Sequence, residues 1–312
     1  MSGRVRALAL VIAIAGSTLL VSAAALGHGA VHERIATLTL QIRAHPNDAA
    51  LLAKRGELHA LDENWTQAAD DFEEALALEP ERADVMHHLA AAKLQLGDAT
   101  EALRLAERSL ERQPDPRALV VRARAHERLG SWRKAVDDMS LVIAKANAPS
   151  PETYVERAHM QERGGDGDGS IAGLHEGMAH LGPLVTLIEP AIEIEARRGR
   201  PAAALALVEH LEPSLATAPR WLAKRGELSE SAGRRDEAKV AYEAALAALD
   251  RLPESRRRAP RHAALRETIV ARLEHLPRVE ATSPATPPRF GAWPALGALA
   301  LGASLGFALQ RR

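Results

Sequence analysis

The sequence predicts an all-α fold built from repeated helix pairs, and three markers with one period carry this prediction. The heptapeptide LAKRGEL at residues 52–58 recurs at residues 222–228, an offset of 170 residues or five periods of 34. Pro46, Pro80 and Pro114 are also spaced by 34 residues. Glycines follow at intervals of 33 to 35 residues, at Gly97, Gly130, Gly165, Gly199 and Gly233. A fixed period of this length is the signature of a stacked repeat architecture.

The composition agrees with this fold class and excludes several others. Aromatic residues make up only 3% of the 312 residues, which is too few for the core of a typical β-sandwich or barrel. The chain has no cysteine, so disulfides, iron–sulfur clusters, thiol catalysis and cysteine-ligated zinc are excluded. The formal net charge of −1 gives no overall attraction to a polyanion, and we therefore expect no nucleic-acid partner.

Residues 1–25 are predicted to be a signal peptide or an uncleaved membrane anchor. Arg4 and Arg6 precede an uncharged run over residues 7–26, which is the order of a basic region and an apolar region in an export signal. Small residues allow cleavage after Ala23 or Ala25, whereas the run is also long enough to span a bilayer. Both alternatives place the following residues outside the cytoplasm.

The next elements are a capping helix over residues 29–46 and six helix pairs over residues 47–252. The capping helix is predicted from the apolar stripe of Val31, Ile35, Leu38 and Ile42 at helical spacing. The pairs are expected to begin near residues 49, 83, 116, 151, 185 and 219. In the first pair, a break near residues 62–64 separates two helices, and Pro80 ends the second because proline cannot continue the hydrogen-bond ladder.

The signature positions of these pairs resemble those of the tetratricopeptide repeat (TPR) family. The first copy carries them as Leu52, Gly56, His59, Ala68, Phe72 and Pro80, and the sixth as Leu222, Gly226, Ala238 and Tyr242. The resemblance implies a right-handed α-solenoid of about six TPR helix pairs with capping helices. The sequence pattern predicts one C-terminal transmembrane helix in addition to this solenoid. Two departures are expected: a loose turn at residues 164–169 in the fourth copy, and a degenerate fifth copy with Ile192 at a position for Gly or Ala.

The C-terminal part is predicted to hold a second cap and a membrane anchor. Residues 253–276 form a capping helix, whose apolar stripe includes Leu265 and Ile269 and whose arginines solvate the solenoid end or meet anionic headgroups. Residues 277–289 are a Pro-rich linker. Residues 290–309 are twenty uncharged residues, enough to cross a bilayer, and residues 310–312 are a basic cytoplasmic tail.

No catalytic or cofactor motif is complete, so we expect a protein that is not an enzyme and has no cofactor. The segment GGDGDG at residues 164–169 lacks the Lys-Ser/Thr of a Walker loop and the bidentate Glu of an EF-hand, which leaves Asp166 and Asp168 as weak calcium candidates. His28 and His32 share one helix face and are weak metal candidates. An envelope metal-handling or metal-sensing protein is therefore the alternative function.

The resemblance implies that the first helices of the pairs line a concave groove for a peptide or a protein segment. The side chains expected to face this groove are Lys54, Glu57, His87, His88, Arg124, Arg128, Glu156, His159, Lys224 and Glu227. Arg117, Arg124 and Arg128 either offer bidentate contacts to an acidic partner segment or form a solvated helix face with i,i+4 pairing. In the first case we expect the combined substitution of Arg124 and Arg128 to weaken partner binding. The predicted function is a non-enzymatic protein–protein interaction scaffold, anchored in the membrane of the bacterial cell envelope with its repeats on the periplasmic or extracytoplasmic side.

Overall fold

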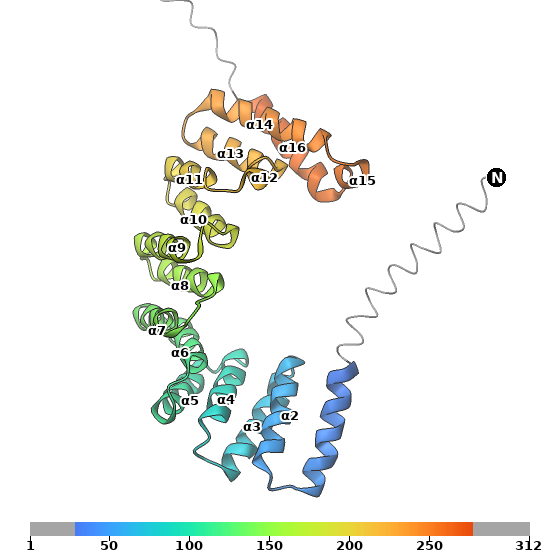
Figure 1. Cartoon of the computed structure of the whole chain (residues 1–312), viewed down its shortest axis with the longest axis vertical. Helices are drawn as coiled ribbons and strands as arrows, with labels where there is room; N and C mark the ends of the chain where they lie inside the picture. The colour runs from blue at the N-terminus through green and yellow to red at the C-terminus, as the bar shows by residue number, and fades with distance from the viewer. Residues whose placement is uncertain (1–28, 277–312) are drawn as a thin grey trace, which may run out of the picture.

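The computed structural model describes residues 29–276, and every regular element in that range is a helix (Figure 1). The all-α fold class is therefore confirmed. The predicted signal peptide, Pro-rich linker, transmembrane helix and basic tail lie outside the described residues. Between residues 29 and 276, none of the helices combines the length and the apolar character that a bilayer-spanning helix requires.

Six helix pairs follow a first helix over residues 29–44. The pairs are α2 (Ala49–Leu61) with α3 (Trp65–Leu78), α4 (Ala83–Gln95) with α5 (Ala99–Arg112), α6 (Pro116–Arg128) with α7 (Trp132–Lys145), α8 (Pro151–Arg163) with α9 (Gly167–Leu181), α10 (Val185–Arg197) with α11 (Pro201–Val208), and α13 (Pro219–Ser231) with α14 (Arg235–Asp250). The short helices α12 (Pro213–Ala216) and α15 (Glu254–Arg257) lie in connections, and α16 (Pro260–His275) ends the described chain.

A three-residue turn with one left-handed residue joins the two helices of every pair. The central residue has a positive φ in all six turns, and it is Glu63 in the first pair and a glycine in the other five: Gly97, Gly130, Gly165, Gly199 and Gly233. Glycine suits this position because it has no Cβ to clash in the left-handed region. The turn at residues 164–166 has the same form, and residues 167–169 are already helical. The expectation of a loose turn in the fourth copy was therefore wrong.

Aspartates fix the starts of several helices. The side chain of Asp48 accepts hydrogen bonds from the backbone N–H groups of Ala50 and Leu51, and Asp115 accepts one from Arg117. Asp98 and Asp166 cap α5 and α9 in the same way. These bonds satisfy N–H groups that have no partner within the helix, and each such cap stabilises a helix by about 1 kcal/mol.

Within each pair, the side chain at the closest helix crossing and the one sixteen residues later are matched in size. A Cβ added to Gly56 would lie 2.6 Å from the ring of Phe72, and a Cβ on Gly226 would lie 2.5 Å from the ring of Tyr242. The other four pairs combine smaller partners, all buried: Ala90 with Ala106, Ala123 with Met139, Ala158 with Leu174, and Ile192 with Val208. In the first and sixth pairs, therefore, glycine is the residue that leaves room for the aromatic ring of the facing helix.

The fifth pair departs from the others in both of its helices. Ile192 fills the small position and is 1% exposed, while α11 has only eight residues and presents Val208 to it. Helix α10 also continues through Pro190, which lacks the N–H that would bond to the preceding turn. Helix α12 follows α11 and contacts α13. The degenerate sequence of this copy thus gives a shortened pair with an aliphatic core.

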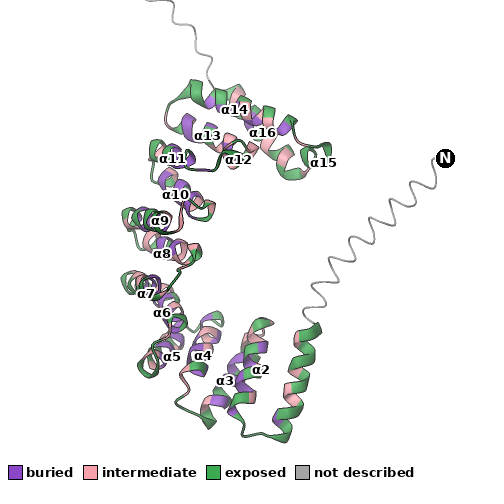
Figure 2. Cartoon of the chain, in the orientation of Figure 1, coloured by how far each residue is buried: buried purple, intermediate pink, exposed green. Residues whose placement is uncertain are grey.

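The pairs stack into an open arc, with the first helices on the inside and the second helices on the outside (Figure 1). First helices of neighbouring pairs contact one another, as α2 with α4, α4 with α6 and α8 with α10. Figure 2 shows the buried residues along the faces where helices meet, whereas the first helix, residues 29–44, is largely exposed. The inner face of the arc is the surface that the six first helices share.

Helix α16 covers the C-terminal end of the arc. It packs against α14 and buries Ile269 in a cluster with Tyr242 and Leu249. Glu230 of α13 accepts a hydrogen bond from the Tyr242 hydroxyl at 2.9 Å and pairs with Arg272 of α16 at 3.3 Å. This contact ties the last first helix, its partner and the terminal helix together.

Candidate functional site

The candidate site is the inner face of the arc, where ion pairs join successive first helices. Arg124 of α6 donates two hydrogen bonds to Glu156 of α8, at 2.6 and 3.0 Å. Glu162 of α8 pairs with Arg197 of α10 at 2.8 Å. Two more pairs, Glu127 with Arg163 and Glu189 with Arg220, make the same kind of connection. We call these four Arg–Glu pairs the inner ladder.

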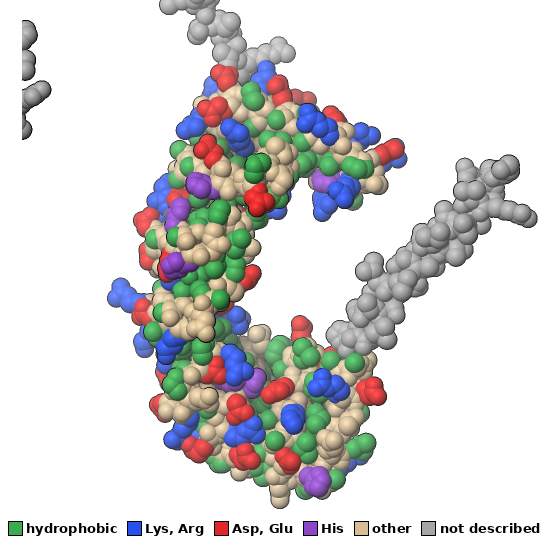
Figure 3. Space-filling view, in the orientation of Figure 1, with side chains coloured by type: hydrophobic (Ala, Val, Ile, Leu, Met, Phe, Trp, Pro, Cys, Tyr) green, Lys and Arg blue, Asp and Glu red, His purple; other side chains and the backbone are tan. Residues whose placement is uncertain are grey.

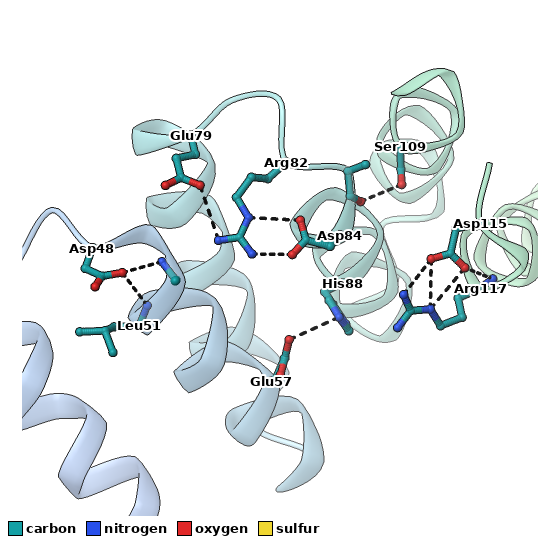
Figure 4. A network of polar contacts seen from close by, with 12 residues as sticks. Asp48, Leu51, Glu57, Glu79, Arg82, Asp84, His88, Ser109, Asp115 and Arg117 are labelled. Carbon is teal, nitrogen blue, oxygen red and sulfur yellow. Dashed lines mark hydrogen bonds and ion pairs between the residues drawn. The ribbon is translucent and has the colours of Figure 1, made fainter. Parts of the chain in front are cut away.

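The inner ladder changes the expectation for the two arginines that were predicted to bind an acidic segment. The guanidinium group of Arg124 already faces the Glu156 carboxylate in a bidentate pair. Arg128 is exposed, and no carboxylate of residues 29–276 lies within ion-pair distance of it. Arg117 pairs with Asp115 at the start of α6, as Figure 4 shows. An acidic segment would therefore have to displace Glu156 before it could engage Arg124.

The residues expected in the N-terminal half of the groove occupy two environments. Lys54 and Glu57 are exposed and line a pocket of about 410 Å³ between α2 and the helix over residues 29–44. Glu57 also reaches across to α4, where its carboxylate lies 3.6 Å from His88 Nε2 (Figure 4). His87 is buried, only 4% exposed, and cannot contact a ligand without a local rearrangement.

His87 and His88 form a compact ring cluster with Phe72. The two imidazole rings are 4.1 Å apart, and His88 stacks on Phe72 at 5.6 Å. Burial, reinforced by the neighbouring His88 and by the positive charge of Arg117, lowers the pKa of His87 to about 4. Burial also lowers the pKa of His88, although Glu57 opposes this shift. Both rings are therefore neutral at pH 7, and the cluster acts as part of the packing.

The C-terminal half of the groove contains a pocket of about 280 Å³ between α10, α13 and α16. Its apolar floor is formed by Ile192, the buried Trp221 and Leu265. Arg220 lies over the Trp221 ring at 5.1 Å from the centroid, a distance typical of a cation–π contact. Charged residues form the rim: Glu189, Glu193, Arg220, Lys224 and Glu227. We call this site the terminal pocket.

The terminal pocket has more negative than positive charge. Three carboxylates and two cations line it, and each cation already has a carboxylate partner. Arg220 pairs with Glu189, and Lys224 lies 3.5 Å from Glu227. Glu193 is only weakly paired, with Arg197 at 3.9 Å. A pocket with an aromatic floor and this rim favours an apolar side chain next to a cationic one.

Two of the predicted groove residues lie in this pocket, and the others that line it were not predicted. Lys224 and Glu227 are on its rim, while Glu156 belongs to the inner ladder and His159 is exposed on α8. Sequence reasoning missed Glu189, Glu193 and Arg220, although they occupy the same helix positions as residues that it did single out. It also missed Leu265, because α16 lies beyond the last full period and no spacing rule places it against α10.

The residues proposed for metal binding are engaged in other contacts or lie apart. Asp166 caps α9, and Asp168 pairs with Arg198 and Arg200 at 2.7 and 2.8 Å. His28 lies outside the described residues, and His32 is 3.7 Å from Asp62. In the described part of the chain, no three His, Asp or Glu side chains are grouped as metal ligands would be.

Comparisons with known proteins support the repeat architecture. Residues 59–127 match a family described as tetratricopeptide repeat. A tetratricopeptide repeat protein from Parabacteroides merdae is 18% identical, and the match covers 78% of this chain and 94% of that one with a TM-score of 0.50. The C-terminal part of a TPR repeat-containing protein from Cytophaga hutchinsonii is 11% identical, with coverage of 72% and 93% and a TM-score of 0.58. No curated protein matches the chain significantly.

Proposed function

We propose that this chain, a TPR-fold solenoid, is a non-enzymatic scaffold that holds a protein or peptide segment on the inner face of its arc. The observation that carries the proposal is the terminal pocket, whose apolar floor opens onto that face. Binding sites in proteins combine such a floor with a few polar groups that orient the ligand. The repeat fold supplies the remaining length of surface, because successive first helices present side chains along one continuous groove.

The proposed ligand segment carries an apolar and a cationic side chain in close sequence. The apolar side chain would cover Trp221 and Leu265, and the cation would lie between Glu193 and Glu227. This choice replaces the acidic ligand that the sequence suggested, since Glu156 already neutralises Arg124. Each pair of the inner ladder also connects one first helix to the next.

We further propose that the scaffold works outside the cytoplasm and is held at a membrane of the bacterial cell envelope. The support is in the sequence: the basic and apolar order of residues 1–25 and the twenty uncharged residues at 290–309. A tethered scaffold meets its partners at the membrane surface, so its effective concentration there is high even when each contact is weak.

Site-specific photo-crosslinking tests the proposed binding face. A photoreactive amino acid replaces Lys224 in the terminal pocket or, as a matched control, Lys239 on α14, outside the pocket. Both lysines are paired with a glutamate on their own helix, at 3.5 and 4.0 Å. We expect position 224 to capture a discrete protein from membranes and position 239 to capture none, as read by mass spectrometry.

The control at position 239 distinguishes a ligand bound in the groove from non-specific crosslinking. Equal capture at both positions, or capture that survives Glu193→Gln combined with Glu227→Gln, would contradict binding in the terminal pocket. The expected effect of that double substitution on the captured amount is a loss of about tenfold, because it removes two charge-assisted contacts to a cation.

A further inference from the structure

The charge of the described chain is strongly divided between the repeats and the end of the solenoid. Residues 29–249 contain 27 Lys and Arg against 36 Asp and Glu, a net charge of −9. Residues 250–266 contain six arginines against two acidic residues, a net charge of +4. We call this second segment, which spans α15 and the start of α16, the basic tip.

Five of the six arginines of the basic tip are exposed, and the sixth, Arg266, is half-buried and pairs with Asp250. Arg251, Arg256 and Arg261 are exposed, and among residues 29–276 no carboxylate lies within ion-pair distance of their side chains. Arg258 pairs with Glu254 on the same short helix, but both side chains are more than 60% exposed. An exposed pair of this kind contributes little and leaves the guanidinium group accessible.

The tip is held in a defined shape. His262 Nδ1 donates a hydrogen bond to the carbonyl of Arg256 at 2.6 Å, and Arg257 donates one to the carbonyl of Asp250 at 3.4 Å. These bonds fold α15 back against the start of α16. Figure 3 shows the resulting basic cluster on the end that projects from the arc, next to α15.

We propose that the basic tip binds the surface of an anionic phospholipid bilayer. A convex array of guanidinium groups attracts a surface of phosphates, since basic residues near an anionic leaflet gain affinity through each added charge. The chain itself brings such a surface within reach. Helix α16 is about 24 Å long and separates the basic tip from residue 276. The thirteen residues 277–289 can span at most about 45 Å, so the uncharged segment begins within this distance of residue 276.

This inference rests on the membrane part of the proposed function and is independent of what the terminal pocket binds. A bilayer contact at the tip would fix the orientation of α16 relative to the membrane. The arc would then stand at a set angle to the surface, with its inner face open to partners.

A single label on the tip tests the contact in the full chain. The chain has no cysteine, so Ser255→Cys gives one site for an environment-sensitive fluorophore on α15. The labelled chain is placed in nanodiscs of phosphatidylcholine alone, or with about 30% phosphatidylglycerol added. We expect a blue shift only in the anionic discs, and we expect high salt to remove it because it screens the charges. A label at Thr66→Cys on α3 should respond to neither lipid.

Charge-matched variants identify the responsible residues. Replacing Arg256, Arg257 and Arg258 with Gln should abolish the shift, whereas replacing Arg104, Arg108 and Arg112 of α5 with Gln changes the net charge equally and should preserve it. An unchanged emission wavelength in anionic discs, or the same blue shift in both disc types, would overturn the proposal that the basic tip binds anionic lipid.

The experiment also separates the lipid contact of the basic tip from the proposed membrane anchor at residues 290–309. If the chain fails to enter neutral discs, the tether is wrong, and the labelled chain is then titrated with phosphatidylglycerol vesicles. In that case the loss of three arginines should weaken vesicle binding about 100-fold. No vesicle binding by the unaltered chain would overturn the basic tip as a lipid contact.

Discussion

In four of the six pairs, Gly or Ala at the small position is combined with a large side chain sixteen places later, whereas the second pair combines Ala90 with Ala106. Gly56 and Gly226 face aromatic rings, and Ile192 faces only Val208. Where the partner is large, a small residue on the facing helix leaves room for it, because the helices pack at close to crystal density. The sequence showed Ile192 as a lapse in the pattern, and the structure shows that a shorter partner and a shorter helix compensate for it.

The first inter-helix turn carries a strain that the other five avoid. Glu63 has φ = 57°, a conformation that costs a non-glycine residue about 1 kcal/mol. We therefore expect Glu63→Gly to stabilise the protein by about 0.5–1 kcal/mol. The relief of backbone strain in the folded state should exceed the free-energy cost of the greater flexibility that glycine gives the unfolded chain. Urea denaturation followed by circular dichroism measures the change. The inverse substitution, Gly130→Glu at φ = 73°, should destabilise by a similar amount, and stabilisation by both would contradict the argument.

The buried His87 makes stability depend on pH. Its pKa of about 4 in the folded state lies below the ordinary value of 6.5, so the unfolded chain binds the proton first as pH falls. The contribution of neutral, buried His87 to the free energy of unfolding is fully present above pH 6.5 and is lost as the pH falls toward 4. Between pH 7 and pH 5 we expect a loss of about 1–2 kcal/mol from this residue, allowing for solvent screening.

The measurement compares urea midpoints at pH 7 and pH 5 for the unaltered chain and for His87→Gln. The variant should lose less stability over this window, while His175→Gln, which changes an exposed ring, should behave as the unaltered chain does. Equal pH dependence in all three would show that His87 is not the group involved. The window stops at pH 5 because arginine-paired carboxylates such as Asp84 and Asp115, whose pKa values are lowered, begin to protonate further down.

At the scale of the helix pair, a buried Arg–Asp contact recurs with the same spacing as the size-matched positions. Arg55 pairs with Asp71 and Arg122 with Asp138, each through two hydrogen bonds across sixteen residues. The aspartates are only about 5% exposed. The second pair has Leu89 and Leu105 at the equivalent positions, both buried in one cluster. One site in the repeat thus accepts either an ion pair or two leucines.

This equivalence predicts a strong coupling between Arg122 and Asp138. Either single change to Leu leaves one charge poorly solvated and should destabilise by about 2–4 kcal/mol, whereas the double change should lie within about 1 kcal/mol of the unaltered protein. A double-mutant cycle by urea denaturation gives the coupling directly. The exposed Arg117–Asp115 pair serves as a control with an expected coupling of about 0–1 kcal/mol. A double variant as unstable as the single ones would refute the equivalence.

At the scale of the whole molecule, the period was sufficient to predict the all-α stack, but not the contacts between neighbouring pairs. The turn glycines and small residues lie within one repeat, so their spacing is visible in the chain. The inner ladder joins residues 31 to 36 positions apart, such as Arg124 and Glu156, and many charges lie at such separations. Helix α16 follows the last period, so the placement of Leu265 against α10 depends on how the end of the stack closes.

The inner ladder has a mechanical consequence for the arc. Each of its pairs joins two neighbouring first helices, so an opening of the arc that is spread over α6 to α13 must lengthen several Arg–Glu contacts at once. Because the arginines of these pairs are exposed, we expect the contribution of the pairs to the stiffness of the arc to fall as ionic strength rises. If a segment binds along the inner face as proposed, opening of the arc would separate the first helices that it contacts.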